Sequence, residues 1–180
     1  MKKHGSGFSL FGICFTILVS FAAFNVSAAQ VGVITTKGKE TLKVKKCKRS
    51  GYHNFPAYVF ILREDKHWDF FDGESNLYAS DFGTYTGSLK SRKFNLASSP
   101  AVTQLMKTTL ENGAAQLCGV GGRLTSYSPF IYRVKLNKNR TSATVTLSSK
   151  LKGISDYGRR TSGSFSLSGK GSYSTQTVSE

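Results

Sequence analysis

The chain has 180 residues, of which 25 are Lys or Arg and 10 are Asp or Glu, so its formal net charge is +15. Its three Cys and three His are not spaced as metal ligands, which excludes a metal centre built from a Cys or His cluster. The positive charge is unevenly spread: residues 82–180 carry fourteen Lys or Arg against three Asp or Glu, whereas residues 30–81 carry nine against seven. A basic region favours polyanionic neighbours, although the same charge also serves solubility alone.

Residues 1–29 have the three parts of a cleavable signal peptide. Two lysines near the start precede an apolar stretch over residues 8–24, and small residues follow at 26–29. A retained anchor is the alternative, but about 17 apolar residues interrupted by Gly, Thr and Ser are marginal for spanning a bilayer. We therefore expect a single domain, residues 30–180, that is exported to the periplasm or out of the cell.

The exported domain contains two cysteines, Cys47 and Cys118. An even number of cysteines in an oxidising compartment predicts a disulfide, with two separate buried thiols as the alternative. The bond would close a loop of roughly 70 residues, for which the chain-entropy argument gives a stabilisation of about 4 kcal/mol.

Most of the domain alternates apolar and polar residues, the pattern typical of a β-strand with one buried face. The predicted strands lie at residues 40–47, 58–62, 67–71, 85–89, 94–96, 130–136, 143–147 and 164–168. Turns are predicted at Asp72-Gly73, at Asn137-Lys138-Asn139 and at Gly169-Lys170-Gly171. One short helix is predicted, which starts at Ser99-Pro100 and stops at Asn112-Gly113.

Short sequence matches suggest an internal repeat, with units at residues 30–104 and 105–180. The segment at 80–83 returns 75 positions later, at 155–158, as a close variant. If the repeat is real, the disulfide joins equivalent strands of the two halves. Coincidence in a chain rich in Ser and Gly is the alternative.

Two halves of four or five antiparallel strands close most economically into one barrel, because closure removes the exposed sheet edges. We therefore predict an all-β fold, an antiparallel barrel of eight to ten strands, with a two-sheet β-sandwich as the alternative. In strand number and length this architecture resembles the lipocalins. The lipocalin Gly-x-Trp signature is absent near the N-terminus and the only tryptophan is Trp68, so the sequence assigns no family.

The sequence offers no convincing catalytic set, and we expect neither an enzyme nor a cofactor. No serine lies in the strand-turn-helix elbow that a nucleophile needs. Six of the ten acidic residues lie within residues 64–81 and are interpreted as a solvated hairpin, in which His67 and Asp69 share one face of a strand. A compact cleft that brings His53 or His67 against Asp81 or Asp156 would reopen the case for a hydrolase.

We expect a non-enzymatic binding protein of the bacterial envelope that carries or senses an apolar or amphiphilic anionic ligand, such as a lipid, inside the barrel. This hypothesis requires an open interior. The candidate ligand-binding residues are Tyr58, Phe60, Trp68, Phe130 and Tyr132, with Arg123, Arg133 and Lys135 near the anionic head group.

The alternative function is that of a basic interaction protein that docks on an envelope polyanion or, like an inhibitor, on a secreted protein. It predicts a packed interior and binding that weakens with salt. Export argues against nucleic acid as the partner. The Ser, Thr and Lys opposite the apolar strand faces, and the lack of a terminal aromatic residue, argue against an integral membrane protein.

Overall fold

The computed structural model describes residues 29–73 and 76–178, without the side chains of residues 53–57 and 77. The expected signal peptide lies outside the described residues, apart from Ala29. No helix in the described ranges is long and apolar enough to span a membrane. The elements are β1 (Ala29–Val44), β2 (Cys47–Leu62), β3 (His67–Asp72), β4 (Leu77–Thr86), β5 (Lys93–Ser98), α1 (Pro100–Cys118), β6 (Gly122–Tyr127), β7 (Ile131–Leu136), β8 (Ser142–Ser155) and β9 (Arg160–Val178).

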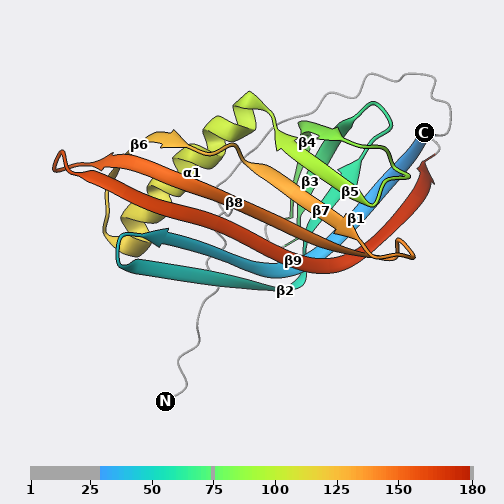
Figure 1. The fold of residues 1–180 in the computed structure, drawn as a ribbon, viewed down its shortest axis with the longest axis horizontal. Helices are drawn as coiled ribbons and strands as arrows, with labels where there is room; N and C mark the ends of the chain where they lie inside the picture. The colour runs from blue at the N-terminus through green and yellow to red at the C-terminus, as the bar shows by residue number, and fades with distance from the viewer. Residues whose placement is uncertain (1–28, 74–75, 179–180) are drawn as a thin grey trace, which may run out of the picture.

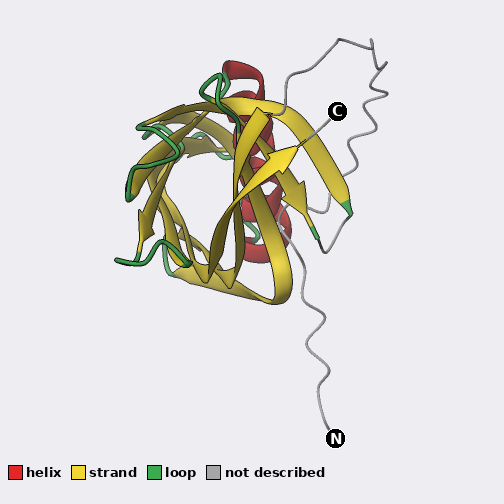
Figure 2. Cartoon of the chain, turned by 90° about the vertical axis from the view of Figure 1, so that its right-hand side faces the viewer, coloured by secondary structure: helices red, strands yellow, loops and turns green. Residues whose placement is uncertain are grey.

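The strands close into an antiparallel eight-stranded barrel rather than a two-sheet sandwich, which confirms the predicted fold class (Figure 1). The order around the barrel is β7-β5-β4-β3-β2-β1-β9-β8, and the pairing of β8 with β7 completes the ring. Strand β6 pairs with the second half of β8, beyond the end of β7. Figure 2 shows the strands curving into this ring with α1 at one side.

The barrel has a closed part and an extension. Strands β1, β2, β8 and β9 have 14 to 19 residues, whereas β3, β5 and β7 have six. The two long hairpins therefore project beyond the short strands, and α1 lies along this extension (Figure 1). A disulfide between Cys47, at the start of β2, and Cys118, at the end of α1, ties the helix to the sheet with the two Cα atoms 5.7 Å apart. The predicted disulfide is thus confirmed.

Aromatic side chains fill the closed part of the barrel. Trp68 is fully buried, and its ring centroid lies 4.7 Å from that of Phe82, 5.5 Å from that of Tyr132 and 5.8 Å from that of Phe60. Ring pairs at these separations are in direct contact and hold one another in place. Side chains therefore occupy the interior around Trp68.

Helix α1 is longer than predicted. It begins as expected, since the Ser99 side chain accepts a hydrogen bond from the Val102 amide, but it continues through Asn112-Gly113 to Cys118. The residues that follow Gly113 are good helix formers, and they carry the helix past this weak point. Gly119, with φ of 61°, adopts the left-handed conformation that ends it.

The turn predicted at Gly169-Lys170-Gly171 is wrong, because β9 runs through it without a break. Both glycines face the interior, where β1 and β9 come close together. A Cβ atom on Gly171 would lie 1.7 Å from the carbonyl oxygen of Thr35. The glycines therefore permit a close approach of two strands instead of reversing the chain.

The arrangement of the elements does not support the internal repeat. The segment at 80–83 lies within β4, whereas the matching segment at 155–158 forms the end of β8 and the following turn. Cys47 begins a strand and Cys118 ends a helix, so the disulfide does not join equivalent strands. The sequence matches thus occur in unlike structures.

Candidate functional site

The eight predicted ligand-binding residues lie in two groups, on opposite sides of the barrel wall. The five aromatic residues of the set are at most 2% exposed and belong to the core. The three basic residues are exposed, since Arg133 and Lys135 alternate along β7 with the buried Tyr132 and Val134. Arg123 is exposed on β6. The fold therefore does not bring these eight side chains together.

The basic residues of β7 belong to a larger surface, which we call the basic sheet face. It consists of the outward side chains of β5, β7, β8, β9, β1 and the first half of β2. The strand registers align these side chains in rows that run across the strands. Row 1 contains Lys93, Lys135, Thr144, Lys170 and Lys37. Row 2 contains Asn95, Arg133, Thr146, Ser168, Lys39 and Tyr52.

Two further rows continue the same face towards the extension. Row 3 contains only hydroxyl side chains, those of Ser148, Ser166, Thr41 and Ser50. Row 4 contains Lys150, Ser164, Lys43 and Lys48. The four rows hold Lys, Arg, Ser and Thr with one Asn and one Tyr, and none of these positions is acidic.

Lysines face lysines directly across neighbouring strands of this face. Lys37 on β1 pairs in register with Lys170 on β9, and Lys93 on β5 pairs with Lys135 on β7. Side chains directly opposite one another in an antiparallel sheet have Cβ atoms about 5 Å apart, and like charges in this position destabilise the sheet. The ion pairs between described residues belong to Arg63, His67 and Lys107, so no described carboxylate neutralises these lysines.

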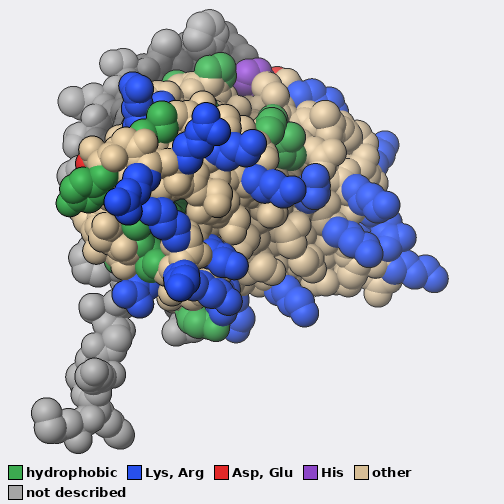
Figure 3. All heavy atoms as spheres, turned by 60° about the vertical axis from the view of Figure 1, so that its left-hand side comes forward, with side chains coloured by type: hydrophobic (Ala, Val, Ile, Leu, Met, Phe, Trp, Pro, Cys, Tyr) green, Lys and Arg blue, Asp and Glu red, His purple; other side chains and the backbone are tan. Residues whose placement is uncertain are grey.

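The positive surface is extensive. Figure 3 shows Lys and Arg side chains spread over one side of the molecule, with Asp and Glu visible only at its margin. A shallow, open depression beside row 1 is lined by Ser91, Arg92, Lys93, Lys135 and Leu136. The surface therefore offers several cations to one extended partner.

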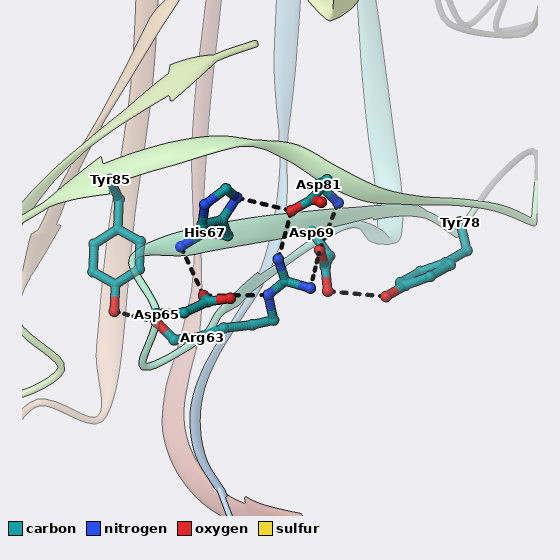
Figure 4. A network of polar contacts seen from close by, with 7 residues as sticks. All are labelled: Arg63, Asp65, His67, Asp69, Tyr78, Asp81 and Tyr85. Carbon is teal, nitrogen blue, oxygen red and sulfur yellow. Dashed lines mark hydrogen bonds and ion pairs between the residues drawn. The ribbon is translucent and has the colours of Figure 1, made fainter. Parts of the chain in front are cut away.

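A second charged cluster surrounds Arg63 (Figure 4). Its guanidinium lies 2.5 Å from Asp81 Oδ1, 3.4 Å from Asp65 Oδ1 and 3.7 Å from Asp69 Oδ1. Partial burial opposes the charge of Arg63, but the carboxylates of Asp69, Asp65 and Asp81 outweigh it and raise the pKa of this guanidinium. One guanidinium thus contacts three carboxylates, and we call these four residues the Arg63 network.

Further hydrogen bonds extend the Arg63 network. His67 Nδ1 lies 2.8 Å from Asp81 Oδ1, and the Tyr78 hydroxyl donates to Asp69 Oδ2 over 2.9 Å. Burial, followed by the hydrogen bond to Asp69, raises the pKa of Tyr78 to about 12. His67 contacts Asp81 because β4 is irregular at this point. Gly83 pairs with Trp68 and Ala79 with Phe70, so three residues of β4, Asp81 among them, lie opposite Asp69 alone.

The contact between His67 and Asp81 is one of those that would reopen the case for a hydrolase, and the side chain of His53 lies outside the described part of the structure. The seven residues drawn in Figure 4 include no Ser or Cys, and their phenols stay protonated at neutral pH. No group of three His, Cys, Asp or Glu in the described part of the chain could hold a metal ion. The carboxylates are already paired with Arg63, so the cluster has the character of a structural network.

A small cavity lies under α1, in the extension. Its volume is about 30 Å³, and its lining includes Leu42, Val44, Leu110 and Glu111. This is the space of about one water molecule. A lipid would have to displace core side chains to enter it.

No protein-family model, curated protein or solved structure matches this chain.

Proposed function

We propose that this protein is a non-enzymatic binding protein. Within that class it docks on an anionic polymer of the cell envelope through the basic sheet face. The disulfide fits an oxidising compartment, and we take residues 1–29 as the export signal. This proposal takes up the second of the two functions expected from the sequence.

The observation that carries the proposal is the pairing of lysines with lysines. Lys37 lies opposite Lys170, Lys93 opposite Lys135 and Lys43 opposite Lys48. The two lysines of each pair repel one another, and none of them forms an ion pair with a described carboxylate. A polyanion laid over the face would replace these repulsions by attractions and release its own counterions. An unbalanced surface of this kind is better explained by a partner than by the needs of the fold.

The rival proposal, a ligand inside the barrel, has less support. Trp68, Phe60 and Tyr132 occupy the interior in mutual contact, and the cavity under α1 holds about 30 Å³. The basic residues that would meet an anionic head group point away from this interior. Native mass spectrometry of protein purified from its own envelope tests the rival directly, because a carried ligand adds a discrete mass.

The proposal is tested by measuring the affinity of the oxidised protein for heparin and for inorganic polyphosphate over a series of NaCl concentrations. We expect the logarithm of the binding constant to fall linearly with the logarithm of the salt concentration. The variant Lys37→Ser/Lys170→Ser is expected to bind about tenfold more weakly and to reduce the salt slope by about two.

The matched control removes two lysines outside the face, Lys66→Asn/Lys107→Gln, and so has the same net charge as the test variant. It is expected to retain most of the affinity and the slope. The absence of binding to either polymer would overturn the proposal. Equal losses in the two variants would also overturn it, since net charge alone would then explain the binding.

A further inference from the structure

The four hydroxyl side chains of row 3 lie at one level across four neighbouring strands. Ser148 of β8 pairs with Ser166 of β9, which pairs with Thr41 of β1, which pairs with Ser50 of β2. The hydroxyls of Thr41 and Ser50 are hydrogen-bonded over 3.0 Å. With strands about 4.8 Å apart, this hydroxyl row is about 14 Å long.

Cations border the hydroxyl row on both sides. Lys39 and Lys43 lie two positions before and after Thr41 on β1, and Lys150 lies two positions after Ser148 on β8. A step of two residues along a strand is about 7 Å. The face is therefore an uncharged track of hydrogen-bonding groups about 14 Å wide between two banks of positive charge.

This combination favours one kind of polyanion. A hydroxyl both donates and accepts hydrogen bonds, as the hydroxyls of a sugar do, whereas a phosphate chain offers only acceptors. Single-stranded nucleic acid is held by aromatic side chains on which the bases stack. The one aromatic side chain in the four rows is Tyr52, and the Lys39 ammonium lies over its ring, 4.8 Å from the centroid.

We propose that the ligand of the basic sheet face is a linear acidic polysaccharide that lies along the hydroxyl row, across the strands. Its sugar hydroxyls exchange hydrogen bonds with Ser148, Ser166 and Thr41. Its carboxylate, sulfate or phosphate groups reach the cations on either bank. This inference rests on the proposed function and adds the chemical class and the direction of the ligand.

The experiment compares two carboxylate polymers, one with hydroxyls (polygalacturonate) and one without (polyglutamate). The test variant, Ser148→Ala/Ser166→Ala/Thr41→Val, removes hydroxyls without changing charge, and Thr41→Val keeps the shape and the strand preference of the side chain. We expect its affinity for polygalacturonate to fall about tenfold or more, its affinity for polyglutamate to stay the same, and both salt slopes to stay the same.

The matched control, Ser172→Ala/Ser174→Ala/Thr175→Val, removes three exposed hydroxyls of β9 away from the row. It is expected to bind both polymers like the parent protein. Circular dichroism checks the fold of each variant, and the single variant Ser148→Ala carries the test if the triple variant is unstable.

The outcomes separate the two proposals. If the parent protein binds polygalacturonate, polyglutamate and polyphosphate equally and in a salt-dependent manner, the proposed function stands and the polysaccharide inference fails. A test variant that loses affinity for both carboxylate polymers alike would also overturn the inference. If the parent protein binds none of the polymers, the proposed function itself fails.

Discussion

The two charged regions of the molecule differ in whether their charges are paired within the molecule. In the Arg63 network three carboxylates converge on one guanidinium, which is two-thirds buried at its side chain. On the basic sheet face, Lys37 meets Lys170 and no described carboxylate is paired with either. Charges that are paired within the molecule stabilise the fold by themselves, whereas charges without an internal counterion gain from a partner that supplies one.

The residue types suit these two roles. The planar guanidinium of Arg63 presents several donors at fixed angles and can serve more than one carboxylate. Lysine is a strongly hydrated point charge on a flexible stem, and it can reach towards anions at different positions along a polymer. The Arg63 network therefore suits a fixed arrangement, and the basic sheet face suits a variable partner.

The largest expected effect comes from breaking the Arg63 network. Arg63→Met leaves Asp69, whose side chain is 5% exposed, without its cation. We expect the free energy of unfolding to fall by about 2 kcal/mol, because a buried carboxylate without a cation beside it is costly and the partial exposure of Arg63 moderates the loss. Urea unfolding measures it, with Lys107→Gln as a control that should cost about 0.5 kcal/mol or less.

Polyanion binding by the Arg63→Met variant tests whether the Arg63 network and the basic sheet face act separately. The affinity for heparin is expected to remain unchanged, because Arg63 lies outside the basic sheet face. A stable variant that has lost affinity for heparin would show that the network takes part in binding.

A smaller effect is expected from the Tyr78 hydroxyl at high pH. The folded protein holds the pKa of Tyr78 at about 12, above the value of 10.0 for a free tyrosine, so the folded state keeps a proton that the unfolded state loses. The stability that this residue provides is therefore present below pH 10 and declines between pH 10 and 12. With allowance for solvent exposure, the decline is about 1 kcal/mol.

Comparison with Tyr78→Phe isolates this contribution from those of other groups that titrate at high pH. The difference in unfolding free energy between the parent protein and the variant should shrink from pH 10 to pH 12. A constant difference over this range would contradict the assigned hydrogen bond to Asp69.

The smallest effect has the opposite sign. Lys37→Thr removes the repulsion with Lys170 and is expected to stabilise the fold by about 0.5 kcal/mol while it weakens polyanion binding. Lys39→Thr makes the same change of charge two positions along β1, but Lys39 faces Tyr52 and Ser168 rather than a lysine. It should give no stabilisation. Thermal unfolding at low salt distinguishes the two variants, and equal shifts would mean that the paired lysines do not repel.

The sequence predicted the features that depend on local pattern. Alternation predicted the strand at residues 130–136 with one apolar face, and the two cysteines predicted the disulfide. The barrel followed from strand number and length. The predicted end of α1 and the predicted turn at 169–171 were wrong. Glycine occurs in turns, within helices and where two strands approach closely, and only the surrounding packing selects among these.

The rows of the basic sheet face could not be predicted from the sequence. The opposition of Lys37 to Lys170 depends on the register between β1 and β9, which are far apart in the chain. The sequence also placed the positive charge in residues 82–180, whereas the face takes Lys37, Lys39 and Lys43 from β1. The Arg63 network was missed because an irregularity in β4 brings Asp81 next to His67.

The pairing of β1 with β9 has a consequence for the order of folding. It extends from Ala29 with Val178 to Val44 with Gly163, so the first and last described strands meet along sixteen consecutive positions. Contacts between segments so distant in the chain form slowly, because a large loop must close before they are gained. Rows 1 to 4 all cross this seam, and none of them exists until it has closed. A refolding protein should therefore regain its affinity for polyanions late, after the local hairpin β8–β9 has formed. The rate at which affinity returns should equal the rate at which the barrel closes.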